Sequence, residues 1–225
     1  MRPDDLIERL VADAHPVRRL SSPLVRSAIW CGATVLFVGL FALGYGLRVD
    51  LPEKLGEPLF VNQMTAALLT GVAAAIAAFH LSLPDRPVWL AWLPVPPLVF
   101  WIGTLSTGCF LDWIDYGADG LAVGNSAMCF VLIAVSGTVP AGLLYAMLRR
   151  TRPFRPMMAT VTGALAVASL AAAGLRLFHE LDASLMVLVW QFGSVAAIVA
   201  AMSSFGSRLW PRVDPKALPL FSRST

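Results

Sequence analysis

The stretch SAIWCGATVLFVGLFALGYGL, residues 27–47, decides the class of fold, because it contains no charged side chain over its whole length. A helix needs roughly 20 predominantly apolar residues to cross a bilayer. Five further runs of this kind follow along the chain, so the sequence predicts six transmembrane helices. The other five are expected at residues 63–83, 88–107, 125–148, 157–177 and 185–207.

The composition of the chain supports this reading. Its 225 residues are 57% hydrophobic and 14% charged, with a mean hydropathy of +0.72. Ordinary soluble domains are about 45–50% apolar and about 25% charged, and one of this size buries only about 70% of the surface that its unfolded chain exposes. The composition therefore excludes a soluble globular enzyme, and equally a disordered or disulfide-rich secreted protein. Because no GxSxG, HExxH, Walker or CxxC motif is present, we expect no enzymatic activity.

The distribution of Lys and Arg predicts how the helices are inserted. With a cytoplasmic N-terminus, 14 of the 17 basic residues fall on the cytoplasmic side, and the outer side holds three basic and eight acidic residues. Such a bias orients insertion. We therefore predict an all-α membrane protein, a six-transmembrane-helix bundle with both termini cytoplasmic. It consists of a cytoplasmic N-terminal tail (1–26), a transmembrane domain (27–207) and a cytoplasmic C-terminal tail (208–225).

Small and aromatic residues predict how the helices pack. Small residues recur at four-residue spacing, which allows close approach of two helices, in Ala67-Gly71-Ala75 and Gly193-Ala197-Ala201. Tryptophans near the expected span ends predict an aromatic belt, with Trp30, Trp89 and Trp210 on the cytoplasmic side and Trp113 and Trp190 on the other. We expect Arg176, at the outer end of the fifth span, to form an interfacial ion pair with Glu180 or Asp182. The middles of the spans lack Asp, Glu, Lys and Arg, which argues against a proton-coupled carrier.

Two of the three cysteines are candidates for a sensor. Cys109 is expected where the third span emerges on the outer face, and Cys129 lies one turn into the fourth span, so both thiols are placed near one end of a helical hairpin. Such a pair can form a disulfide in an oxidising compartment, or bind Cu(I) or Zn, for which soft thiolates are suited. Met128 and His179 are candidate additional ligands on the same face. The alternative is that each cysteine only packs, as we expect of Cys31.

The N-terminal tail is the one cytoplasmic segment with a helical pattern. Asp5 is expected to cap the helix with Glu8 at its third position, and His15-Pro16 ends it. An apolar stripe at helical spacing is formed by Leu6, Ile7, Leu10, Val11 and Ala14. A helix of about ten residues is not stable alone in water, so the apolar stripe must be buried against another surface. Periodicity alone favours the membrane surface, aided by Arg9, Arg18 and Arg19, over a groove in a partner protein.

The chain resembles the NrsF family of membrane anti-sigma factors, negative regulators of the extracytoplasmic-function (ECF) sigma factor F. The resemblance runs from about residue 4 to residue 208 and rests on the order and spacing of short motifs. At the start of the chain these are Asp5-Leu6-Ile7…Leu10 and Pro16-Val17-Arg18-Arg19-Leu20…Pro23. Later motifs are Gly46-Leu47-Arg48-Val49-Asp50, Leu69-Thr70-Gly71, Gly108-Cys109…Asp112-Trp113, Gly124-Asn125-Ser126…Cys129 and Leu177-Phe178-His179…Asp182-Ala183-Ser184-Leu185-Met186.

The resemblance implies a bacterial inner-membrane protein that holds an ECF sigma factor at the cytoplasmic face while stress is absent. It also implies that Cys109 and Cys129 take part in sensing redox or metal stress. Asn125 departs from the pattern, in which His is expected as often as Asn, and a neutral amide is a poor ligand for a soft metal. The C-terminal tail with Leu218-Pro219-Leu220-Phe221 lies outside the resemblance.

We therefore expect a membrane-bound anti-sigma factor whose tail and basic loops bind the sigma factor without direct contact to nucleic acid. The sigma-binding residues are expected to be Leu6, Ile7, Leu10, Val11, Arg18 and Arg19, and the sensing thiols Cys109 and Cys129. No cofactor is expected other than Cu(I) or Zn at the cysteine pair. The alternatives are a small transporter or channel, which needs polar groups along a path, and a membrane thiol oxidoreductase, which normally needs a CxxC motif and a quinone site.

Overall fold

The computed structural model describes residues 21–116, 127–151 and 153–178, together with Glu8, Val11 and Gly193. Of residues 112, 115, 116 and 127–134 it describes only the backbone. This part of the chain is all helical, without a strand, which confirms the predicted fold class at that level. Its elements are α2 (Pro23–Tyr45), α3 (Leu51–Lys54), α4 (Pro58–Leu81), η1 (Val88–Trp92), α5 (Val95–Tyr116), α6 (Ala127–Arg149) and α7 (Pro156–Leu175).

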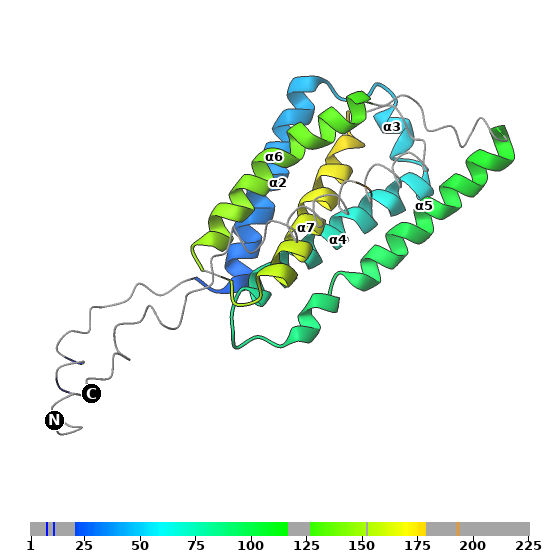
Figure 1. Cartoon of the computed structure of the whole chain (residues 1–225). Helices are drawn as coiled ribbons and strands as arrows, with labels where there is room; N and C mark the ends of the chain where they lie inside the picture. Colours follow the sequence, from blue (N-terminus) through cyan, green and yellow to red (C-terminus); the bar gives the residue numbers. More distant parts are fainter. Residues whose placement is uncertain are drawn as a thin grey trace.

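The long helices alternate in direction along the bundle (Figure 1). At one end α2 and α7 begin and α4 and α6 end; we call it the Arg26 end after a residue near the start of α2. At the opposite end, the Arg48 end, α2 and α7 finish and α4 and α6 begin. Four helices within the described ranges are long and apolar enough to cross a membrane, namely Pro23–Tyr45, Pro58–Leu81, Val88–Leu111 and Pro156–Leu175. The sixth predicted span, 185–207, lies outside the described residues apart from Gly193.

Proline fixes where three of the helices begin. Pro23, Pro58 and Pro156 each occupy the first turn of their helix, where a backbone N–H has no intrahelical acceptor and its absence costs nothing. Ser22 caps α2 by accepting the Val25 N–H on its Oγ at 3.3 Å. Because these starts depend on local backbone geometry and not on hydropathy, α2 and α4 begin four and five residues before the predicted spans.

The predicted third span is confirmed as part of a helical segment of spanning length, Val88–Leu111, but this segment is divided internally. Within it, a 3-10 helix at Val88–Trp92 precedes the α-helix α5, which begins at Val95. Pro94, Pro96 and Pro97 explain this break, since they cannot donate backbone hydrogen bonds to the preceding turn. At its other end α5 continues to Tyr116, about two turns beyond Cys109.

The centre of the bundle is the contact between α4 and α7, which is the most extensive helix pair among the described residues. Ala67, Gly71 and Ala75 are all buried there, which confirms the role predicted for this small-residue series. A Cβ atom added to Gly71 would lie 2.8 Å from Cγ of Leu170 on α7. The helices therefore approach each other through glycine and alanine, as helices do when no hydrophobic effect drives their association. The second series lies outside the described residues apart from Gly193.

Substituting Gly71 with Leu should destabilise the bundle by about 1–3 kcal/mol, because α4 and α7 must move apart to accept the side chain. The matched control is Gly103→Leu on the exposed side of α5, where an added Cβ meets no atom within 4 Å. Thermal unfolding in detergent micelles checks the prediction. Equal melting temperatures for the two variants would contradict the close packing of α4 on α7.

The tryptophans divide between the surface and the interior. Trp89 and Trp113 expose 63% and 52% of their surface, as expected of belt residues. The assignment of Trp30 to the belt was wrong, because this residue is fully buried, about two turns into α2. Its ring N–H finds a backbone acceptor inside the bundle, which removes the need for interfacial water. Trp190 and Trp210 lie outside the described residues.

Candidate functional site

The predicted sigma-binding residues lie almost entirely outside the described part of the chain. Leu6, Ile7, Leu10, Arg18 and Arg19 are among the residues that are not described. Val11 is helical and exposes 69% of its surface, and Glu8 is helical and exposed as well. The tail as a sigma-binding element therefore remains a prediction.

Of the predicted sensor residues, only Cys109 is described with its side chain, which is half-buried on α5. Met128 and Cys129 lie in the first turn of α6, and the structure describes only their backbone. His179 lies outside the described residues. α5 packs on α4, whereas α6 packs on α7 and α2. The distance between the two thiols thus stays a prediction. No group of three or more His, Cys, Asp or Glu that could hold a metal was found in the part of the chain that the structure describes.

At the Arg26 end, one buried arginine joins three helices. Arg26, the last residue of the predicted N-terminal tail, lies inside α2 and exposes only 6% of its surface. Its Nη2 donates to the carbonyl oxygen of Met147 on α6 at 2.6 Å, and its guanidinium lies 4.8 Å from the ring centroid of Phe79 on α4. A cation is stabilised there because the last carbonyls of α6 carry the negative end of the helix dipole.

A second buried hydrogen bond joins α2 and α6 deeper in the bundle. Nε1 of Trp30 on α2 donates to the carbonyl oxygen of Pro140 on α6 at 3.0 Å, and both residues are fully buried. Pro140 lies inside α6, where proline interrupts the regular hydrogen bonding of a helix. Sequence reasoning missed both connections between α2 and α6. A proline inside an apolar span and an arginine directly before one were the available signals.

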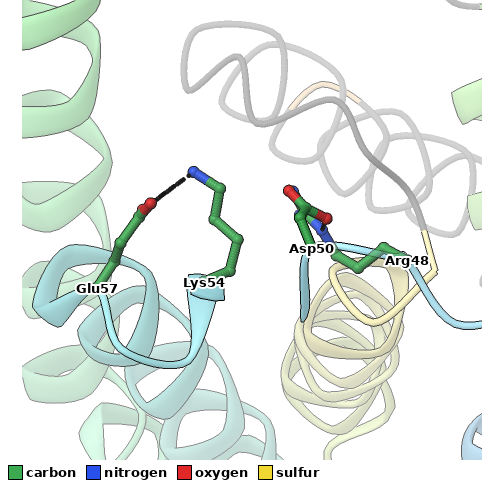
Figure 2. A network of polar contacts seen from close by, with 4 residues as sticks. All are labelled: Arg48, Asp50, Lys54 and Glu57. Atoms are coloured by element: carbon green, nitrogen blue, oxygen red, sulfur yellow. Dashed lines mark hydrogen bonds and ion pairs between the residues drawn. The ribbon is translucent and has the colours of Figure 1, made fainter. Parts of the chain in front are cut away.

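At the Arg48 end, a second buried arginine fastens the chain after α2. Gly46 ends this helix with a φ of 107°, a backbone conformation that glycine adopts without strain. The Arg48 N–H donates to the carbonyl oxygen of Leu177 at 3.0 Å, which ties this loop to the end of α7. The guanidinium of Arg48 donates from Nε and Nη2 to the two carboxylate oxygens of Asp50, each at 2.7 Å (Figure 2).

An aromatic ring connects the two arginines of this end. The guanidinium carbons of Arg48 and Arg176 lie 5.6 and 5.3 Å from the ring centroid of Phe60 on α4, within the range of cation–π attraction. The partners predicted for Arg176, Glu180 and Asp182, lie outside the described residues. Phe178 completes the region by packing its ring on those of Phe41 and Tyr45, with centroids 5.5 and 5.3 Å away. The Arg48 end is therefore closed by interlocking contacts between α2, α4 and α7.

The ion pair between Arg48 and Asp50 predicts an acid dependence of stability. The hydrogen bonds from Arg48 hold the pKa of the Asp50 carboxyl below its ordinary value of about 3.9. The pair thus stabilises the fold at any pH above that ordinary value, and this contribution is lost as the pH falls through the lowered pKa of the folded state.

Accordingly, Asp50→Asn should lower the melting temperature at pH 6, and this deficit should shrink as the pH falls through the lowered pKa of Asp50. The control is Glu57→Gln, which breaks the exposed ion pair that Lys54 makes at 2.9 Å (Figure 2) and should change the melting temperature little at any pH. A deficit of Asp50→Asn that stays constant as the solution is acidified would contradict the ionic origin of the contact.

The described helices and their two ends define an all-helical bundle of apolar helices tied together by buried arginines. The family comparison then gives its place: the chain belongs to the NrsF family, described as negative regulator of sigma F, whose model matches residues 10–210. This confirms the resemblance read from the sequence and makes a sigma factor the partner. No curated protein and no solved structure matches the chain significantly.

Proposed function

We propose that this protein is a membrane-bound anti-sigma factor that holds an ECF sigma factor at the cytoplasmic face of the bacterial inner membrane. The observation that carries the proposal is the family match, which covers both the bundle and the chain before it from residue 10. Four apolar helices of spanning length support the membrane location. Because the family is one of transcriptional regulators, we propose no catalytic activity for this chain.

The N-terminal helix is the proposed sigma-binding element. A helix of about ten residues is not stable alone in water. A groove in a partner protein is a standard way to bury the apolar stripe of such a helix. The exposure of Val11 agrees with a stripe that is not covered by the bundle. The tail leads directly into α2 at the Arg26 end, and the bias in Lys and Arg supports a cytoplasmic location of this end.

Release of the sigma factor is proposed to follow disulfide formation or Cu(I) or Zn capture at Cys109 and Cys129 on the periplasmic side. Because α5 packs on α4 and α6 on α7 and α2, joining the thiols would pull two differently packed helices together. α6 carries Cys129 at one end and the Met147 carbonyl that binds Arg26 at the other. A displacement of α6 would thus reach α2 and the tail, provided that the two arrangements differ in affinity for the sigma factor.

Transcription in living cells tests this function. Deleting the gene should raise expression from a sigma-F-dependent promoter in unstressed cells, and a plasmid copy of the full chain should restore repression. The same plasmid in a strain that also lacks sigma F should have no effect on the reporter. Unchanged reporter activity in the deletion strain would contradict the proposed function.

A further inference from the structure

Two loops at the Arg26 end are joined to each other by hydrogen bonds. The first, residues 82–87, connects α4 to η1, and the second, residues 149–155, connects α6 to α7. The Phe154 N–H donates to the carbonyl oxygen of Ser82 at 3.2 Å, and Nη1 of Arg155 donates to the carbonyl oxygen of Arg86 at 2.9 Å. We call the two segments the loop platform, of which residue 152 lies outside the description. They are remote in sequence and form one surface.

Hydrogen bonds within each loop fix the platform further. The Ser82 hydroxyl donates to the carbonyl oxygen of Phe79 at 2.7 Å. The Thr151 hydroxyl and backbone N–H both donate to the carbonyl oxygen of Leu148, at 2.7 and 3.0 Å. The second loop thereby closes the end of α6 and holds the backbone before Phe154 in a defined position.

The outer surface of the platform is basic and partly apolar. Its two segments contain Arg86, Arg149, Arg150, Arg152 and Arg155 but only one acidic residue, Asp85. The side chains of Arg86, Arg149 and Arg150 are exposed. Beside them Phe154, which precedes the spanning helix α7, exposes 65% of its surface. Aromatic and Arg side chains are among the types enriched in protein interfaces.

We propose that the loop platform is a second docking surface for the sigma factor, one that takes an acidic surface with an apolar pocket for Phe154. This inference rests on the proposed function and adds a second contact to the one proposed for the tail. The family match gives a sigma factor as the partner of this chain, and the cross-loop hydrogen bonds hold the exposed Phe154 ring in a fixed position that a pocket in that partner can receive. The tail leads into α2 at the same end, so the two contacts bind one partner and each raises the effective concentration for the other.

Binding of purified sigma F to the full chain in phosphatidylcholine nanodiscs tests the platform. Phe154→Ala should weaken binding at least tenfold. Arg149→Gln with Arg150→Gln should also weaken it and should flatten its dependence on salt, because fewer charge contacts are screened. The matched control is Phe110→Ala, which removes a phenylalanine that exposes 56% of its surface on α5, remote from the platform, and should leave binding as in the wild type. Size-exclusion chromatography checks that each variant is folded.

The outcomes separate the platform from the function on which it rests. If the wild type binds and Leu10→Glu does not, but both platform variants bind normally, the platform is refuted and the anti-sigma function stands. If the arginine substitutions weaken sigma F binding only when the chain is embedded in vesicles that contain phosphatidylglycerol, the arginines contact lipid and the proposal is overturned. Failure of the wild-type chain to bind sigma F would overturn both.

Discussion

Leu10→Glu is expected to raise transcription from sigma-F-dependent promoters in unstressed cells to the level of a strain that lacks the chain. The substitution places a charge in the middle of the apolar stripe that we propose to lie in a groove of the sigma factor. Truncating a residue at the centre of such an interface typically costs about 2–4 kcal/mol, and burying a charge there costs more. An affinity loss of at least 30-fold follows, since each 1.4 kcal/mol is a factor of ten. A sigma-dependent reporter measures the effect.

The helical pattern supplies the control for this substitution. Ala12 lies on the opposite face of the predicted helix, so Ala12→Glu introduces the same charge without touching the stripe. It should repress as the wild type does, whereas Leu6→Glu should behave like Leu10→Glu. Membrane fractions should contain equal amounts of all variants, because the apolar spans are unchanged. If Leu10→Glu represses normally while correctly inserted, the tail is not the sigma-binding element.

The double variant Cys109→Ser, Cys129→Ser is expected to bind the sigma factor but to lose the response to copper or oxidant. Removing both thiols abolishes either a disulfide or a shared soft-metal site, while the tail and the connections between α2 and α6 remain. The reporter should therefore stay repressed after a stress that induces the wild-type strain.

The third cysteine provides the matched control. Cys31 is half-buried on α2 and packs against the core cluster that contains Trp30 and Phe79. Cys31→Ser removes a thiol of the same chain without touching the proposed sensor, and its strain should respond to stress as the wild type does. A stress response that survives in the double variant would show that Cys109 and Cys129 only pack and that the sensor lies elsewhere.

Hydropathy predicted the helical class and the approximate position of the described helices, because the length of an apolar run can be counted in the sequence. It failed at the boundaries, where local chemistry decides. Pro58 starts α4 before the apolar run begins, and Pro94 divides the third predicted span. These effects act through backbone hydrogen bonds and φ angles, which an average over side-chain hydropathy does not contain.

The buried polar connections could not be predicted for a different reason. An arginine before an apolar run reads as a positive-inside residue, and nothing in the sequence reveals that Arg26 meets the carbonyl of Met147, 121 residues away. The same holds for Trp30 and Pro140 and for the hydrogen bonds that form the loop platform. Each depends on which helices become neighbours. The thiol pair and the tail could be proposed from the sequence because their residues lie close together along the chain. Both remain predictions.

Co-purification tests the central claim most directly. A tagged full-length chain is solubilised from membranes of unstressed cells in mild detergent and captured, and bound sigma F is quantified against an untagged control strain. The account predicts that sigma F is retained by the tagged chain and is recovered in the soluble fraction when the cells carry Leu10→Glu. Recovery of sigma F only in the soluble fraction of wild-type cells, with the tagged chain intact in the membrane, would contradict the claim that this protein holds the sigma factor there.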